Sequence, residues 1–450
     1  MDNINFSFYN KFYFCGVGGV SMSAIATFLV EKNKQVAGSD KMVNNQVLSL
    51  SRLGVKTYIG HKARNVKNFN PDVLVYTNAV DLDKNREVLY AIKKGIPIVS
   101  RSKLLGEIIK GYKLSVAISG SHGKTTTTCM VTKVLKENKT NPTAFVGGNS
   151  GGINNYTSGN NDLVITEACE YKKSFLDLHS DIAVVLNIDN DHLDCYKNME
   201  ELKRAFSEFV KPSIAIVNND DEYAKEISTQ TKITYAIKNK ATYRAKYIAL
   251  NEHGYSFTVY KNKARQARIN LSVAGYYNIY NALACYVVCD LLNVPKQTIA
   301  KGLMSFNGAD RRLEYIGKRG GVNYVCDYAH HPTEIKATLG AINLKNTLII
   351  FQPHTYSRTK ILLKDFICVL SSISNLCLYK TYSARERYDR KASARFLYKS
   401  LSKKSRNNLH YASNYKQLQK VIRTNSPFIE SVVFLGAGDI YDIAKKLQKM

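Results

Sequence analysis

Short apolar runs alternate with longer segments of helical spacing through the first third of the chain. The runs at Phe12–Cys15, Gln35–Ala37, Val73–Tyr76 and Ile96–Val99 predict β-strands, because each is short and ends at polar or turn-forming residues. Strands that alternate with helices build parallel β-α units. We therefore expect this part of the chain to form an α/β domain.

The same alternation begins anew twice. The pattern relaxes over Arg101–Lys113 before a strand starts at Leu114, and it breaks again near Phe306–Arg311. The other predicted elements are strands at Leu163–Thr166, Ile182–Asn187, Ile214–Asn218, Asn323–Asp327, Thr347–Gln352, Leu376–Lys380 and Ser431–Leu435, a β-rich stretch at Ile233–Leu271 and a helix at Tyr277–Leu292. A chain of 450 residues is too long for one ordinary core. We predict three α/β domains, at 1–110, 111–308 and 309–450.

The net charge of +28 invites a nucleic-acid interpretation. The lysines, however, are spread along the whole chain instead of forming one block. Lys, Asn, Ile and Tyr are abundant and Trp is absent, which is typical of a genome rich in A and T. We favour this coding bias, with small anionic substrates, over a nucleic-acid partner. A diffuse positive field would still steer phosphorylated ligands towards the protein.

The cysteines and the apolar runs favour a protein of the cytoplasm. Nine cysteines are scattered singly with no C-x-x-C pair, which indicates reduced thiols in the cytoplasm. No run approaches the roughly 18 apolar residues of a membrane span, so no membrane partner is expected. The first residues, MDNINFSFYNKFYFCGVGG, lack the charged and apolar regions of a signal peptide.

A first glycine turn, CGVGGVSMSAIA, lies between a predicted strand and a helix. Gly16 and Gly18 allow a diphosphate to approach backbone N–H groups at the helix N-terminus. The third position of the dinucleotide fingerprint is Ser21 instead of Gly, and Asp40 lies near the distance expected for a ribose-binding acid. A nucleotide or nucleotide-sugar site is one interpretation. A structural strand-to-helix turn is the other.

A second turn, SGSHGKTTTT, follows the apolar run that starts at Leu114. The usual phosphate loop, G-x-x-x-x-G-K-[ST], would need glycine where the chain has Ile118, so this turn is shorter. Lys124 can still reach β- and γ-phosphates, and Thr125 can face Mg²⁺. A helix start capped by hydroxyl groups is the alternative. The helix dipole disfavours a lysine at that position, and a bound phosphate would relieve the penalty, so we favour the phosphate site.

Acidic residues follow the next two predicted strands. One strand ends in Glu167, and the following strand leads into IDNDHLD, which contains His192. The carboxyl ends of adjacent parallel strands are where open α/β sheets bind ligands. Mg²⁺ prefers oxygen ligands. Any single aspartate here could equally be a solvated loop charge, but Glu167 and His192 beside a Lys-Thr turn favour a metal site.

Three later clusters also carry candidate chemistry. Asn278 and Asn281 lie one helical turn apart and could bind a base or ribose, or could form an ordinary polar helix face. The segments DYAHHPTE and QPHTYSR each follow a predicted strand and place His and Arg at strand ends. They indicate a polar site at the carboxyl edge of the third domain, with buried core histidines as the alternative.

These motifs together resemble the Mur ligases of peptidoglycan synthesis. The matching segments are FCGVGGVSMSAIA, GSHGKTTTT, EACEYKKSFL, NIDNDHLD, GYYNIYNALA, DYAHHPTEI, FQPHTYSRTK and FLGAGDI. They span nearly the whole chain in the order of the family, and the short phosphate loop is the family's own version. DYAHHPTEI with FQPHTYSRTK favours the member of the family that adds L-alanine.

The resemblance implies three domains with separate tasks. They are an N-terminal Rossmann-like domain that binds UDP-N-acetylmuramate, a central P-loop-type ATPase domain with a mostly parallel sheet, and a C-terminal Rossmann-like domain that closes over L-alanine. ATP and Mg²⁺ are the implied cofactors. The implied sugar-nucleotide and amino-acid contacts are Gly16, Gly18, Gly19, Ser39, Asp40, His330 and His354. The implied ATP contacts are Gly120, Ser121, His122, Gly123, Lys124, Thr125, Thr126, Asn278, Asn281 and Asp327. The implied metal ligands are Thr125, Glu167 and His192, and the implied catalytic residues are Lys124, Glu167, His192, His331 and Arg358.

The implied reaction is an ATP-dependent amide-bond formation through an acyl phosphate. Two departures from the family are Tyr277, where histidine is frequent, and Thr355, where some members have arginine. Because of Tyr277, the residues that contact adenine are not assigned. Because of Thr355, Arg358 is the preferred candidate for binding an anion. The rivals are a ligase that adds glutamate, a nucleotide-sensing protein without turnover, and a nucleic-acid-binding protein.

Overall fold

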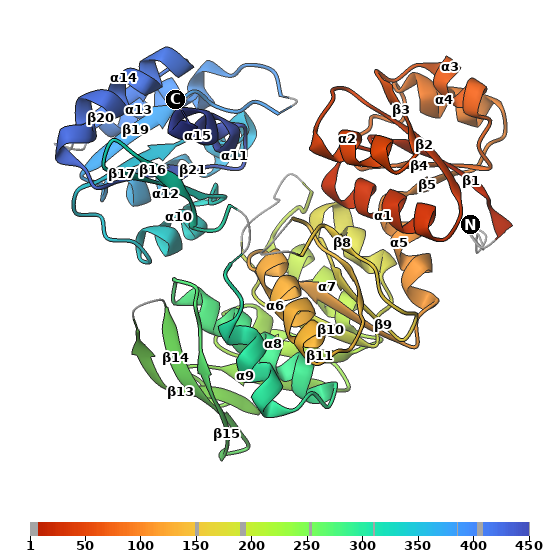
Figure 1. The fold of residues 1–450 in the computed structure, drawn as a ribbon, viewed down its shortest axis with the longest axis horizontal. Coiled ribbons are helices and arrows are strands. Elements are labelled where there is room, and N and C mark those ends of the chain that lie inside the picture. The colour runs from red at the N-terminus through yellow and green to blue at the C-terminus, as the bar shows by residue number, and fades with distance from the viewer. Residues whose placement is uncertain are drawn as a thin grey trace. The chain divides into compact units, whose positions relative to one another are not determined.

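The computed structural model describes residues 8–148, 153–189, 195–251, 254–308, 311–384, 386–402 and 408–449. These residues form three sheets flanked by helices, and most strand pairs are parallel (Figure 1). The prediction of an α/β protein with three domains is confirmed. The first two sheets belong to one compact unit and the third sheet to another. No helix among the described residues is long and apolar enough to cross a membrane.

The first sheet has the strand order β3-β2-β1-β4-β5, and all its pairs are parallel. Its strands are β1 (Lys11–Cys15), β2 (Gln35–Asp40), β3 (Lys56–Ile59), β4 (Val73–Tyr76) and β5 (Ile98–Ser100). Its helices are α1 (Val20–Glu31), α2 (Asn45–Arg52), α3 (Ala63–Phe69), α4 (Arg86–Lys93) and α5 (Arg101–Lys110). The strand order reverses at β1, so the glycine turn after β1 lies at the topological switch point where such sheets bind ligands.

The central strand of this sheet is buried on both faces. Phe12 and Phe14 belong to one hydrophobic cluster, and Tyr13 and Cys15 belong to another. Successive side chains of a strand point to opposite faces, so helices must cover both. This is why the run reads as continuously apolar in the sequence.

The second sheet has ten strands in the order β15-β14-β13-β12-β11-β10-β6-β9-β7-β8. The strands are β6 (Leu114–Ser119), β7 (Thr143–Phe145), β8 (Tyr156–Thr157), β9 (Leu163–Glu167), β10 (Ile182–Val185), β11 (Ile214–Asn218), β12 (Lys232–Ala236), β13 (Tyr243–Leu250), β14 (Tyr255–Lys261) and β15 (Ala264–Asn270). The helices are α6 (Lys124–Glu137), α7 (Met199–Val210), α8 (Tyr277–Leu291) and α9 (Lys296–Met304), with short 3₁₀ segments η2 (Tyr171–Asp177) and η3 (Ala224–Glu226). Strand β6 lies between β9 and β10 and pairs with both in parallel. The turn after β6 and the acidic segments after its neighbours therefore meet at one edge.

The first and second sheets share a hydrophobic core. Phe28 of α1 packs edge-on against Phe145 of β7, with ring centroids 5.7 Å apart. The hydroxyl of Ser102 in α5 donates to Asp177 Oδ2 at 2.5 Å. Apolar and polar contacts thus tie the first domain to the segment that follows β9.

The third sheet has the order β16-β17-β21-β18-β19-β20, and only the β16–β17 pair is antiparallel. The strands are β16 (Glu314–Arg319), β17 (Val322–Asp327), β18 (Thr347–Phe351), β19 (Asn375–Tyr379), β20 (Asn408–Ala412) and β21 (Ser431–Leu435). The helices are α10 (Pro332–Leu339), α11 (Tyr356–Ile361), α12 (Leu363–Leu370), α13 (Ala394–Ser402), α14 (Tyr415–Asn425) and α15 (Ile440–Lys449), with η4 (Arg390–Ala392) and η5 (Ser426–Phe428). Asp327 and Phe351 both pair with Leu435, one on each side, so the polar segments after β17 and β18 begin at the same edge.

Candidate functional site

The turn between β6 and α6 has a backbone that only glycine accommodates well. Gly120 has φ +142° and Gly123 has φ +86°. A Cβ atom on Gly123 would lie 2.5 Å from Oδ1 of Asn281, and one on Gly120 would lie 3.0 Å from Cβ of Leu186. The turn is therefore packed tightly against α8 and the end of β10. Asn281, a predicted ATP contact, is brought to the turn.

The segment after β10 forms hydrogen bonds with this turn. Asn187 accepts from the backbone N–H of His122 at 2.8 Å and donates from Nδ2 to the His122 carbonyl at 3.0 Å. The Asp189 N–H donates to Ser121 Oγ at 2.9 Å, and Asp189 Oδ2 lies 2.9 Å from His122 Nε2. The side chains of Ser121 and His122 thus anchor the turn to the sheet. Asn187 was missed as a candidate, although it is the first residue of the NIDNDHLD motif.

Lys124, the first residue of α6, turns its ammonium back into the turn. Its Nζ donates to the carbonyls of Gly120 and Ser121 and lies 2.9 Å from Glu170 Oε2. The exposed fraction of the side chain is 16% for Lys124 and 1% for Glu170. Burial by itself would lower the pKa of Lys124, but the carboxylate of Glu170 outweighs it and raises that pKa above its ordinary value. The turn therefore holds a fixed positive charge. Glu170 was not among the predicted site residues.

Two predicted metal ligands lie against one short segment. Glu167 ends β9, and its Oε1 accepts from the Gly147 N–H at 2.5 Å. A Cβ atom on Gly148 would lie 3.4 Å from Cγ2 of Thr125. A carboxylate and a hydroxyl beside a phosphate turn suit Mg²⁺. The third predicted ligand, His192, lies outside the described residues. The metal site therefore stays a prediction, and Glu167 and Thr125 fit it.

The first glycine turn is closed by the residue predicted to bind ribose. Asp40 Oδ2 accepts from the Gly18 N–H at 2.9 Å, and the Gly16 N–H donates to the Ser39 carbonyl at 2.8 Å. Gly19 follows as the N-cap of α1. Ser39 is fully buried, and its hydroxyl donates to Glu87 Oε2 at 2.5 Å. The structure thus brings Gly16, Gly18 and Asp40 together at the strand edge, while the Ser39 side chain faces the interior.

Asp327 organises the loop at the end of β17. Its carboxylate accepts from the N–H groups of Leu313 at 2.9 Å and Ala329 at 2.8 Å, and from the Thr338 hydroxyl at 3.2 Å. Burial raises the pKa of Asp327 above its ordinary value, although Arg312 and the backbone donors act in the opposite direction. The contact between Asp327 and ATP that the resemblance implies stays a prediction. The observed hydrogen bonds already use both carboxylate oxygens.

The two adjacent histidines of the third domain have different surroundings. His331 is the N-cap of α10, where its Nδ1 accepts from the Thr333 N–H at 3.3 Å. The ring of His330 meets the ring of His354 edge-on, with centroids 5.6 Å apart. The predicted pair His330 and His354 therefore lies together, from segments after two different strands. Glu334, missed in the sequence, lies 3.2 Å from His330 Nδ1.

A strained backbone precedes Arg358. Thr355, the N-cap of α11, has φ +65° and ψ 151°, a region that non-glycine residues rarely adopt. Its N–H donates to the Tyr382 carbonyl at 2.8 Å, and Glu386 accepts from the Tyr356 N–H at 2.6 Å. These contacts fix the helical turn that carries Arg358. Tyr382 and Glu386 had no signal in the sequence.

The start of α8 carries the other predicted ATP contact. Asn278 is buried, and its Nδ2 donates to the Ala274 carbonyl at 2.6 Å. Burial raises the pKa of the neighbouring Tyr277 phenol above its ordinary value, and the negative charge of Asp327 adds to the rise. Tyr277 is therefore a neutral phenol at this place.

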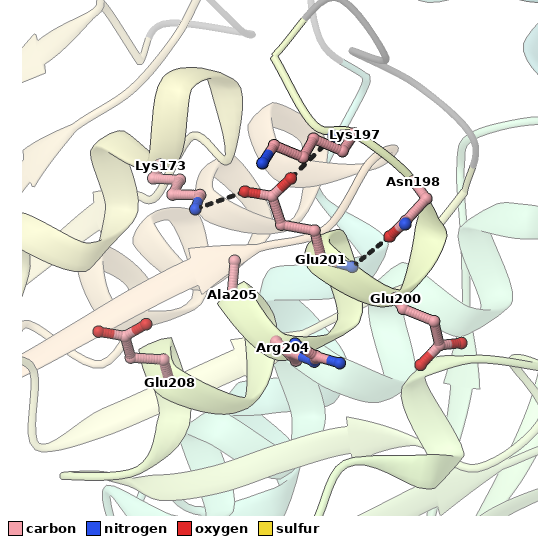
Figure 2. Close-up of a pocket in the computed structure, with 8 residues that line it drawn as sticks. All are labelled: Lys173, Lys197, Asn198, Glu200, Glu201, Arg204, Ala205 and Glu208. Carbon is pink, nitrogen blue, oxygen red and sulfur yellow. Dashed lines mark hydrogen bonds and ion pairs between the residues drawn. The ribbon is translucent and has the colours of Figure 1, made fainter.

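A separate pocket of 450 Å³ lies along α7 (Figure 2). Its lining includes Lys173, Glu200, Glu201 and Arg204, and Glu201 lies 2.7 Å from the Lys173 ammonium. Seven of its eight lining residues are charged or polar, and none of the eight is a predicted site residue.

Known protein families and relatives match nearly the whole chain. Models of three domains match it: the Mur ligase family catalytic domain at 11–113, the Mur ligase middle domain at 118–289, and the Mur ligase glutamate ligase domain at 311–438. The chain is 42% identical over 445 residues to a UDP-N-acetylmuramate–L-alanine ligase of Clostridium tetani, covering 96% of each chain. A relative of the same name from Clostridium acetobutylicum is 40% identical over 449 residues, covering 97% of this chain and 96% of that one.

Solved structures agree in fold. The crystal structure of UDP-N-acetylmuramate-alanine ligase from Thermotoga maritima superposes with a TM-score of 0.84 at 27% identity, covering 98% of both chains. A murein peptide ligase from Psychrobacter arcticus superposes with a TM-score of 0.73 at 21% identity, covering 97% of this chain and 98% of that one. The second similarity is one of fold alone.

Proposed function

This chain belongs to the Mur ligase family, and from that premise we propose that it joins L-alanine to the lactyl carboxylate of UDP-N-acetylmuramate. The reaction consumes ATP, releases ADP and phosphate, and supplies a precursor for peptidoglycan. The names of relatives that match over nearly the whole chain support this assignment. The observation that carries the mechanism is the Lys124 ammonium, held inside a glycine turn at the carboxyl edge of the central sheet.

The turn binds the triphosphate of ATP. Backbone N–H groups at the start of α6 and the Lys124 charge attract the phosphates, and Lys124 stabilises the phosphoryl group in transfer. Thr125, Glu167 and His192 would hold Mg²⁺, which would supply positive charge against the phosphate oxygens. Asn281 lies against the turn and, with Asn278, is assigned to the adenosine.

The first chemical step activates a carboxylate, which is otherwise a poor electrophile. The lactyl carboxylate attacks the γ-phosphorus, and ADP leaves, which gives an acyl phosphate. The amine of L-alanine then adds to the acyl carbon, and the tetrahedral intermediate expels phosphate. Both steps concentrate negative charge on oxygen, and Lys124 and Arg358 are the cations assigned to stabilise it.

The first and third domains bind the other two substrates. Gly16, Gly18 and Asp40 form the turn assigned to the diphosphate of the sugar nucleotide. His330, His331, His354 and Arg358 are assigned to the amino acid and the acyl phosphate. Closure of the third domain would protect the acyl phosphate from hydrolysis. Because the substrates are cytoplasmic nucleotides, we assign the enzyme to the cytoplasm.

Phosphate release tests the substrate assignment. Purified protein is given ATP, Mg²⁺ and UDP-N-acetylmuramate with L-alanine, glycine, L-serine or D-glutamate in turn. We expect release to require the sugar nucleotide and to be fastest with L-alanine. Faster release with D-glutamate would favour another ligase of the family, and no release with any amino acid would favour a nucleotide sensor.

Isotope exchange tests the order of the steps. Without L-alanine, the protein should form bound acyl phosphate and ADP reversibly. ATP labelled with ¹⁸O in the β–γ bridge should then scramble its label, only when UDP-N-acetylmuramate is present. Reduction by borohydride traps the acyl phosphate as a second readout. If neither signal appears while turnover with L-alanine is normal, the route through an acyl phosphate is wrong.

A further inference from the structure

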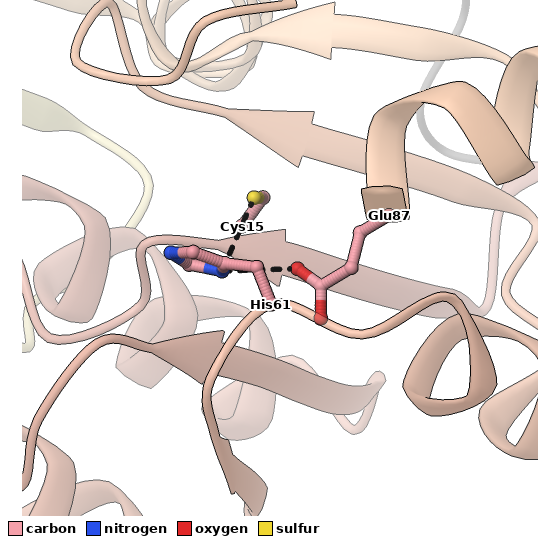
Figure 3. Close-up of side chains that lie close together, drawn as sticks. All are labelled: Cys15, His61 and Glu87. Carbon is pink, nitrogen blue, oxygen red and sulfur yellow. Dashed lines mark hydrogen bonds and ion pairs between the residues drawn. The ribbon is translucent and has the colours of Figure 1, made fainter. Parts of the chain in front are cut away.

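A polar cluster lies at the carboxyl edge of the first sheet, inside the domain. Cys15 is the last residue of β1, His61 lies between β3 and α3, and Glu87 is the second residue of α4. The side chains of Cys15 and Glu87 meet the same nitrogen of His61 (Figure 3). Cys15 and Glu87 are fully buried, and the His61 side chain is 16% exposed. The histidine is therefore the one side of the cluster that reaches solvent.

Three polar groups converge on one ring nitrogen. His61 Nδ1 lies 3.7 Å from Cys15 Sγ, 3.2 Å from Glu87 Oε2 and 2.8 Å from Ser39 Oγ. A ring nitrogen carries at most one proton and can make one good hydrogen bond. A proton on Nδ1 can therefore form a good hydrogen bond to only one of these three atoms. A metal ion can be coordinated by several of them at once.

The distances match those between ligands of a tetrahedral metal. Metal–sulfur bonds of about 2.3 Å and metal–nitrogen or metal–oxygen bonds of about 2.0 Å place S and N about 3.5 Å apart and N and O about 3.3 Å apart. The observed separations are 3.7 Å and 3.2 Å, and the three ligand atoms all lie within 4.8 Å of one another. We propose that Cys15, His61 and Glu87 bind a transition-metal ion of the zinc class. Thiolate with imidazole selects such ions over Mg²⁺ and Ca²⁺.

The surroundings of Glu87 resemble the outer shell of a metal site. Its other oxygen, Oε1, accepts from the Tyr13 hydroxyl at 2.7 Å and from Asn65 Nδ2 at 2.8 Å. Its Oε2 accepts from the Ser39 hydroxyl at 2.5 Å and lies 3.2 Å from His61 Nδ1. Such partners orient ligands and raise metal affinity.

The site lies directly behind the first glycine turn. Cys15 precedes Gly16, and Ser39 precedes Asp40, whose carboxylate holds the Gly18 N–H at 2.9 Å. A bound ion would join the ends of β1 and the loop after β3 to α4, and so would stiffen the base of this turn. It would be a structural ion with no part in the ATP-dependent step. The inference does not rest on the proposed function.

Cobalt binding tests the proposal on the intact protein. Because Cys368 is exposed, the test is made in a Cys368→Ser background, after treatment with a chelator. Co²⁺ should produce a near-ultraviolet thiolate band and the visible bands of a tetrahedral ion, both saturating at one ion per chain. Zn²⁺ should abolish both. Cys15→Ser should remove the near-ultraviolet band, and Cys377→Ser, which changes a buried thiol elsewhere, should retain it.

Two further variants keep the test decisive. Tyr13→Phe leaves all three ligands in place and should weaken zinc binding by about 10- to 100-fold, as losses of outer-shell partners do. If Cys15→Ser does not fold, His61→Gln is read instead and should weaken binding at least as much. Absence of the bands in the parent protein, or a thiolate band that survives Cys15→Ser, would overturn the proposal.

Discussion

The ammonium of Lys124 lies 2.9 Å from the carboxylate of Glu170, a residue that is almost completely buried. The two residues are 46 positions apart, and the pair is formed beneath the glycine turn assigned to ATP. In the proposed complex with ATP, the ammonium of Lys124 would face both this carboxylate and a phosphate. This relationship sets what substitutions at either position should do.

Lys124→Ala should lower the turnover of ATP at least about a thousandfold, because the transferring phosphoryl group loses its nearest fixed charge. Folding should survive the change, as expected from the sequence. The variant nevertheless leaves the buried Glu170 carboxylate without the ammonium of Lys124. We expect a loss of stability of about 3–5 kcal/mol, measured by denaturant unfolding.

A double-mutant cycle separates the two effects. Glu170→Gln removes the buried charge but keeps the shape of the side chain. Lys124→Met with Glu170→Gln should therefore be more stable than Lys124→Met alone, while both remain inactive. Additive losses of stability in the cycle would mean that the ion pair has no energetic weight.

Glu167→Gln should bind Mg²⁺ more weakly and lose activity that higher Mg²⁺ or Mn²⁺ partly restores. Thr125→Ala combined with it should cost far less than the sum of the single losses, because residues that act on one ion are not additive. His192→Gln should likewise lose activity that higher Mg²⁺ or Mn²⁺ partly restores. The measurement is initial rate against metal concentration, and indifference of Glu167→Gln to the metal would remove this residue from the metal site.

Asn187→Ala should raise the KM for ATP and destabilise the protein by about 1–3 kcal/mol, because two hydrogen bonds to His122 are lost. Asn218→Ala is a matched control. Asn218 is buried, whereas Asn187 is partly buried, and Asn218 Nδ2 donates to the Leu186 carbonyl at 3.1 Å instead of to His122. The control should lose stability with an unchanged KM. An equal rise in KM for both variants would show that the effect is not specific to the turn.

Asp220 should stabilise the fold at neutral pH, and this contribution should be lost in acid. Burial by itself would raise its pKa, but the backbone N–H groups of residues 237–239 and the Tyr280 hydroxyl hold the pKa of Asp220 below its ordinary value. A lowered carboxyl pKa stabilises the fold above the unfolded value of about 3.9, and the contribution is lost as the pH falls through the folded pKa. The difference in unfolding free energy between wild type and Asp220→Asn should be constant above about pH 5 and shrink towards pH 2. A constant difference throughout would contradict the assignment.

Local pattern in the sequence was enough for much of the fold and for the glycine turns at the strand ends. Apolar runs predicted β4 at its observed bounds and β1 to within one residue, and SGSHGKTTTT predicted a tight turn where β6 leads into α6. Such features depend on residues close in sequence, since periodicity and glycine conformations are local properties. The residue roles within the site stay predictions, and His192 lies outside the described residues.

Only the tertiary structure decided which side chains meet. It paired Lys124 with Glu170, placed Asn281 against Gly123, and turned Ser39 inward to Glu87. None of these contacts has a local signal, because parallel strands bring together residues that helices separate along the chain. The sequence alone thus determined which groups are available at each strand end. The register and order of the strands decided which of them pair, and burial there decided which charges need a partner.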